Sequence, residues 1–146
     1  MTPHDLFPIP NTAALLCWLM LMVSPPGSAW PRRIALGAAV LLAMTYAALI
    51  GAFVSQGQGD FQSLAGVQRL FQHPGLLLAG WVHYLVFDLL VGLWERAEAQ
   101  RIGLSRWLLL PCLFLTFMFG PIGWLVFLAV RQFRLRSEPA AAAIAL

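Results

Sequence analysis

Apolar residues are concentrated in four long runs, which short polar segments separate. The runs cover residues 7–23, 34–54, 76–94 and 107–130. Each comes close to the roughly 20 helical residues that cross the hydrocarbon layer of a membrane. The first run is the shortest, and Pro8 and Pro10 interrupt it. The pattern predicts an all-α membrane protein in which residues 1–146 form a single domain with four transmembrane helices.

The polar segment between the second and third runs has a helical pattern of its own. After Asp60, a good N-cap residue, apolar side chains occupy about one half of a helical wheel. They are Phe61, Leu64, Val67, Leu70 and Phe71. The pattern predicts a short amphipathic helix over residues 61–73 that lies in the membrane interface; the alternative is a polar loop with chance periodicity. Residues 137–146 are mostly small and are expected to form a flexible tail.

Composition supports the membrane class. Hydrophobic residues make up 60% of the chain and charged residues 10%, against roughly 45–50% and about 25% in soluble globular proteins. The basic residues are all arginines near the ends of the runs, where they attract anionic lipid headgroups, so the net charge does not indicate nucleic acid as a partner.

Four spans would divide the arginines between two compartments. One side would carry five arginines and the other four: Arg32, Arg33, Arg96, Arg101 and Arg106 against Arg69, Arg131, Arg134 and Arg136. This balance does not orient the protein, and both termini would share one side.

The third run contains an aspartate where a membrane helix is normally apolar. A charged side chain at mid-membrane costs at least about 2.5–3.5 kcal/mol, so such a residue usually faces a protein interior and marks function. At about 100° per residue, Trp81, Tyr84, Asp88 and Glu95 form one stripe. Tyr84 and Asp88 are spaced for a hydrogen bond. His83 points about 140° away but could flank the same cavity.

The third run therefore predicts an acid/base site with Asp88, His83 and Tyr84 as candidate catalytic residues. The alternative is that these polar groups only hold helices together.

The fourth run carries small residues and a proline. Cys112, Thr116, Gly120 and Gly123 recur at helical spacing and predict a groove, while Pro121 deprives the Phe117 carbonyl of its helical partner. We expect a kinked helix beside the carboxylate, although a kink used only for packing is the alternative. The candidate substrate-binding residues are Trp81, Phe87, Gly92, Thr116, Phe117, Gly120, Pro121 and Gly123.

The usual motifs for binding a metal or a cofactor are absent from the sequence. The chain has three histidines, at positions 4, 73 and 83, which is too few for the clustered histidines of membrane di-iron enzymes. Bis-histidine haem would need a second well-buried histidine, and no glycine-rich phosphate loop is visible. We therefore expect neither a metal nor a cofactor.

Several segments together resemble a known family. They include "GDFQSLAGVQRLFQHPG", "WVHYLVFDLLVGLW" and "PCLFLTFMFGPIGW", within residues 59–131. The chain resembles the abscisic-acid-deficient, neoxanthin-synthase-type family of small integral membrane proteins. The resemblance implies a role in carotenoid metabolism, where plant members are linked to the isomerisation of violaxanthin to neoxanthin. It implies a hydrophobic, carotenoid-like ligand, in addition to the membrane lipids that surround the protein.

That isomerisation consumes no electrons and needs only an acid and a base. One interpretation is therefore a cofactor-independent carotenoid or isoprenoid isomerase. The alternative is a membrane protein that binds carotenoid or lipid, or assists assembly, without turnover. The start "MTPHDLF" lacks the basic residues of signal and organelle leaders, so we expect a bacterial protein in the inner membrane.

Overall fold

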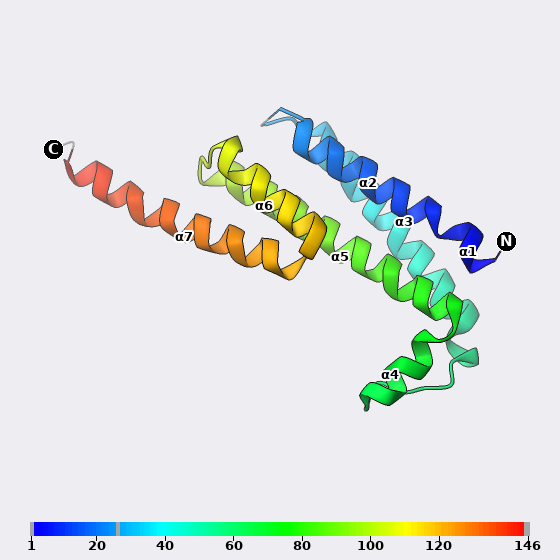
Figure 1. Cartoon of the computed structure of the whole chain (residues 1–146). Coiled ribbons are helices and arrows are strands. Elements are labelled where there is room, and N and C mark those ends of the chain that lie inside the picture. Colours follow the sequence, from blue (N-terminus) through cyan, green and yellow to red (C-terminus); the bar gives the residue numbers. More distant parts are fainter. Residues whose placement is uncertain (1, 26, 145–146) are drawn as a thin grey trace.

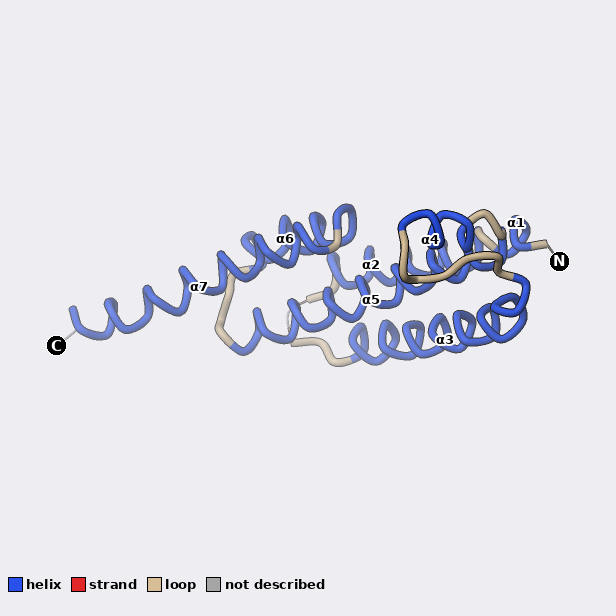
Figure 2. Tube along the Cα trace, turned by 90° about the horizontal axis from the view of Figure 1, so that it is seen from below, coloured by secondary structure: helices blue, strands red, loops and turns tan. Residues whose placement is uncertain are grey.

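The computed structural model describes residues 2–25 and 27–144, with side chains described as far as Arg136, and all its regular elements in this part are helical (Figures 1 and 2). The predicted all-α class is confirmed for these residues. The elements are α1 (Pro3–Leu6), α2 (Pro8–Val23), α3 (Trp30–Phe53), the 3-10 turn η1 (Val54–Gln56), α4 (Leu64–Phe71), α5 (Pro74–Arg101), α6 (Arg106–Phe119) and α7 (Pro121–Ile144).

Three stretches of the described chain are long and apolar enough to cross a membrane. They are Pro3–Val23, Trp30–Gln56 and Pro74–Arg101, and they contain the first three predicted runs. Pro8 and Pro10 do not interrupt the first of them, because both lie in the opening turn of α2, where a missing amide proton costs little.

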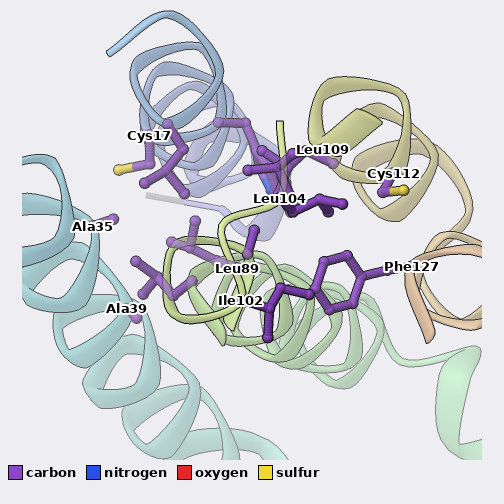
Figure 3. Packing of buried hydrophobic residues seen from close by; sticks show 14 residues of the cluster. Cys17, Ala35, Ala39, Leu89, Ile102, Leu104, Leu109, Cys112 and Phe127 are labelled. Carbon is purple, nitrogen blue, oxygen red and sulfur yellow. The ribbon is translucent and has the colours of Figure 1, made fainter. Parts of the chain in front are cut away.

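The helix α5 lies at the centre of the bundle. It contacts α2, α3, α6 and α7, and its longest contact is with α3, whose Ala35 and Ala39 are buried. Such small residues let two helix backbones approach closely in a membrane. One hydrophobic cluster joins side chains of α2, α3, α5, α6 and α7, including Cys17, Leu89 and Phe127 (Figure 3).

The fourth predicted run is not a single helix, and this part of the prediction is wrong. α6 ends at Phe119, the chain reverses at Gly120, and α7 returns beside α6 (Figure 1). Gly120 has φ +48°, which favours glycine, and Pro121 is the first residue of α7, where it needs no amide proton. The expected kink at Pro121 is therefore a turn between two helices.

The hairpin of α6 and α7 does not cross the bundle. The 14 residues of α6 span about 21 Å at 1.5 Å per residue, against a hydrocarbon layer of about 30 Å. Its turn reaches the middle of α5, and α7 then runs back to the end from which α6 entered (Figure 1). Among the described helices, three candidate spans and one re-entrant hairpin replace the four predicted spans.

The hairpin also moves arginines to the opposite end from the one predicted. Arg131 of α7 binds Glu98 near the end of α5, with Nε 2.6 Å from Oε1. A Cβ at Gly103 would lie 3.8 Å from the Arg134 guanidinium. Both arginines therefore lie beside Arg101, and the expected division of five against four is wrong. We call this end, where α2 finishes and α3 begins, the arginine-rich end.

The opposite end carries α4 and α1. Arg69 lies on α4, and residues of α1 and the start of α5 line one shared pocket. α7 finishes beyond the arginine-rich end (Figure 1). The described chain thus begins and finishes at opposite ends of the bundle, and the expectation that both termini share one side is corrected.

This charge asymmetry predicts the orientation of the protein. Loops rich in arginine stay in the cytoplasm, so we expect the arginine-rich end to be cytoplasmic. In spheroplasts, a membrane-impermeant maleimide should label Gln58→Cys in the α3–α4 loop, and should label Gln100→Cys only after lysis. Cys17 and Cys112 are buried and supply a low background. The opposite labelling pattern would contradict the prediction.

α4 is shorter than the predicted helix and begins later. Its N-cap is Ser63, whose hydroxyl accepts from the Gly66 amide at 3.0 Å. Asp60 instead accepts from the Gln62 and Ser63 amides at 2.9 and 3.1 Å and closes the preceding turn. The interfacial position of α4 stays a prediction. So does the flexibility of residues 137–146: α7 continues to Ile144, and residues 145–146 lie outside the described chain.

Candidate functional site

Asp88 lies at the centre of α5, opposite the turn of the re-entrant hairpin. Its side chain is 9% exposed. A Cβ built on Gly120 would lie 2.9 Å from Asp88 Oδ1 and 3.3 Å from Oδ2, so the carboxyl group packs against the backbone of the turn. Within the described chain, Oδ2 has no hydrogen-bond partner. The neighbouring Tyr84 phenol interacts with this carboxyl group, as their spacing predicts.

A second carboxyl group, that of Glu95, lies two turns further along the same face of α5. It is fully buried, and its Oε1 accepts a hydrogen bond from the Thr116 hydroxyl at 2.8 Å. Its Oε2 has no partner among the described atoms. Glu95 was not among the predicted site residues because the third apolar run ends at Trp94. The stripe from Trp81 to Glu95 was the signal that could have identified it, because a buried carboxyl group on the same face as Asp88 is a candidate for the same site.

The hairpin supplies the surface that faces these two carboxyl groups. Thr116 is fully buried on α6, and Gly123 on α7 lies against its backbone, since a Cβ at Gly123 would overlap the Thr116 nitrogen and Cα. Thr116, Gly120 and Gly123, which were predicted as site residues, therefore do come together. Pro121 lies beside them as the first residue of α7.

The side chain of Trp18 on α2 occupies the space beside Gly92, which has no side chain of its own. A Cβ there would overlap the far edge of the Trp18 ring. Trp18 is 2% exposed, and its ring lies tilted at 5.6 Å from that of Phe117. The space beside Gly92, a candidate substrate-binding residue, is therefore filled by a side chain. Gly92 is instead the contact point between α5 and the Trp18 side chain.

Two predicted residues lie apart from the carboxyl groups. The exposed His83 ring lies 5.4 Å from Tyr46 of α3 and 4.6 Å from Phe87 on its own helix. This face of α5 is not the one that meets the hairpin. The structure therefore does not bring His83 or Phe87 to Asp88.

An open apolar groove runs beside Tyr84 on the outside of the bundle. Its volume is about 330 Å³, and its lining comes from α2, α5 and α6, including Leu15, Trp81, Tyr84 and Phe117. Trp81 stacks on Tyr84 at 5.4 Å and donates a hydrogen bond from Nε1 to Asn11 Oδ1 at 2.8 Å. Aromatic walls of this kind suit a flat apolar molecule that enters from the lipid. Tyr84 links the groove to Asp88.

The cation nearest in sequence does not neutralise Glu95. Arg96 is buried, but its guanidinium donates to the carbonyls of Leu21, Ser24 and Pro25 at the end of α2. These carbonyls lack partners within α2, and their partial negative charge favours a cation. No group of three or more side chains of the metal-ligating types gathers within the described residues.

The arrangement is suited to proton transfer. Both carboxyl groups of the stripe are removed from water, and each has an oxygen that no described group satisfies. In such surroundings, a carboxyl group is easier to keep neutral than charged, and a neutral carboxyl group can donate a proton. Tyr84 lies between Asp88 and the groove and can pass that proton on.

Comparison with known proteins places the chain in a family. The model of the ABA4-like family, described as ABA DEFICIENT 4-like, matches residues 5–127. No curated protein and no solved structure matches the chain. The matched region contains α2 to α6 and the hairpin turn, so it includes the residues of the stripe and of the groove. The chain therefore belongs to the ABA DEFICIENT 4-like family.

Proposed function

We propose that the protein is a cofactor-independent isomerase of carotenoids or related isoprenoid lipids in the inner membrane of a bacterium. Family membership supports a role resembling that of the plant proteins. The observation that carries the proposal is the buried Asp88 carboxyl group, which contacts Tyr84 at the apolar groove and has one oxygen without a partner in the described chain. Buried carboxyl groups in a membrane are costly, so a functional role is the default hypothesis for them.

The reaction needs one proton to be donated and one to be taken back. Neutral Asp88, acting through the Tyr84 hydroxyl, protonates the epoxide oxygen as its carbon–oxygen bond breaks. The carboxylate that remains then accepts, through the same hydroxyl, a proton from the polyene, and an allene forms. The formula of the lipid is unchanged and no electrons are consumed. His83 has no part in this scheme because it lies on another face of α5.

Glu95 supports the scheme as a second buried carboxyl group. Thr116 orients it through the hydrogen bond to Oε1, and it lies two turns from Asp88 on the same face of α5. Both carboxyl groups therefore face the hairpin.

A second candidate function is binding or assembly without turnover. One observation favours it: the Asp88 carboxyl group does not itself line the groove, and only Tyr84 connects the two. The groove would then hold a carotenoid or another lipid without changing it.

A conversion assay separates the two functions. Liposomes containing the purified protein are incubated with violaxanthin without any added cofactor, and pigments are separated and analysed by mass spectrometry and absorption. We expect a product of unchanged mass and altered spectrum, and none in liposomes without protein. Unconverted pigment that copurifies with the protein would support binding and overturn the isomerase proposal.

A further inference from the structure

A second groove lies between α3 and α5 at the arginine-rich end. Its volume is about 260 Å³, and it is lined by Arg32, Leu36, Leu90, Leu93, Trp94 and Ala97. Leu36 and Leu90 are partly exposed on the outside of the bundle, and Trp94 is 42% exposed. Tryptophan at such a position is typical of the membrane interface. The groove thus has an apolar floor and a single charge, that of Arg32.

The charge of Arg32 is not balanced by any described part of the chain. No ion pair or hydrogen bond joins its side chain to the described residues, whereas four other arginines at this end have partners. Arg96 and Arg106 bind carbonyls at the end of α2, and Arg101 and Arg131 bind Glu98. An anion for Arg32 must therefore come from outside the described residues.

We propose that this groove binds an anionic glycerophospholipid. The phosphate pairs with the Arg32 guanidinium, whose planar donors match phosphate oxygens, and an acyl chain lies along Leu36, Leu90 and Leu93. The Arg32 charge, which no described carboxylate offsets, would repel the choline cation of a zwitterionic lipid, so a headgroup with net negative charge is favoured.

The proposal is independent of the isomerase proposal. The groove is built from α3 and the last third of α5, and it shares no lining residue with the groove beside Tyr84. Loss of lipid binding and loss of conversion are therefore separate results.

Native mass spectrometry of the purified full chain tests the site. The protein in detergent receives equal amounts of phosphatidylglycerol and phosphatidylcholine with the same acyl chains, and the lipid retained per protein is measured. The test variant is Arg32→Gln. The matched control is Arg33→Gln, which removes the same charge from the neighbouring position outside the groove. Ala97→Phe fills the groove and leaves both arginines in place. Far-ultraviolet circular dichroism checks that each variant is folded.

We expect the wild-type protein to retain phosphatidylglycerol in preference to phosphatidylcholine. One arginine contact with an anionic lipid raises the binding constant by about fivefold. Arg32→Gln should therefore lower phosphatidylglycerol retention by about fivefold, and Arg33→Gln should lower it by less than twofold. Ala97→Phe should lower the retention of both lipids.

Three results would each overturn the proposal. The first is equal loss in the two arginine variants, which would indicate a diffuse surface charge. The second is unchanged retention in Ala97→Phe. The third is displacement of the lipid by millimolar inorganic phosphate, which would mean that the headgroup alone is recognised.

Discussion

Replacing Asp88 by asparagine is expected to lower the rate of isomerisation by about 10²–10⁴-fold, the usual contribution of a positioned acid/base group. Asparagine has nearly the same shape, so the contact with Gly120 is preserved and the variant should stay folded. It cannot donate and recover a proton as a carboxyl group does. The measurement is the initial rate of violaxanthin conversion in liposomes, compared at equal protein content.

The matched control is Asp60→Asn, the same chemical change in the loop before α4. Asparagine can still accept the amide hydrogen bonds that Asp60 accepts, so neither folding nor rate should change. Tyr84→Phe should resemble Asp88→Asn, because it removes the hydroxyl group that connects Asp88 with the groove. A folded Asp88→Asn protein that converts pigment within about threefold of the wild-type rate would exclude Asp88 as the proton carrier.

Replacing Gly123 by alanine is expected to destabilise the protein by about 3 kcal/mol, the upper end of the usual range for overpacked sites. The added methyl group would overlap the backbone nitrogen and Cα of Thr116, which cannot move aside as a flexible side chain can. α7 must then separate from α6, and the hydrogen bond from Thr116 to Glu95 is strained or lost. The measurement is reversible unfolding in mixed micelles of increasing dodecyl sulfate content, followed by circular dichroism.

Gly37→Ala is the matched control for this prediction. Gly37 lies within α3, and a Cβ there meets nothing within 4 Å. Because alanine is the better helix former, this variant should be slightly more stable, by up to about 1 kcal/mol. If the two variants were equally stable, the close packing of α6 against α7 would be refuted.

The hairpin explains how an irregular backbone can lie at the depth of Asp88. In the hydrocarbon layer, unpaired backbone groups are tolerated only where protein covers them or where they line a cavity. The Gly120 amide donates to the Thr116 carbonyl at 2.8 Å, and the Gly120 carbonyl accepts from the Trp124 amide at 3.2 Å. The turn is therefore largely satisfied locally, and the side chain of Asp88 covers it.

The helical class, the family and the pairing of Tyr84 with Asp88 could all be predicted from the sequence. These are local or pairwise properties: apolar runs form helices in lipid, and residues four apart share a helix face. Thr116, Gly120 and Gly123 could also be predicted, since small residues at helical spacing indicate close packing whichever partner they meet.

The positions of Glu95 and His83 relative to the site could not be predicted from the sequence. Glu95 lies next to Arg96 in the chain, and that neighbour suggests a surface position. In the structure, Arg96 donates hydrogen bonds to carbonyls at the end of α2, whereas Glu95 accepts one from Thr116. His83 lies near Asp88 in sequence but faces Tyr46. Which face of α5 meets which helix depends on the packing of the whole bundle.

The sequence by itself determined that this is a helical membrane protein with an acidic stripe on its third apolar run. Only the tertiary structure decided that the fourth run turns back at Gly120, that Glu95 is buried on the same face of α5 as Asp88, and that most arginines share one end. The physical reason is that an apolar run has the same hydropathy whether it is straight or folded. The direction of a Gly-Pro break is set by the surfaces that pack around it, here Thr116 against Gly123 and Asp88 against Gly120.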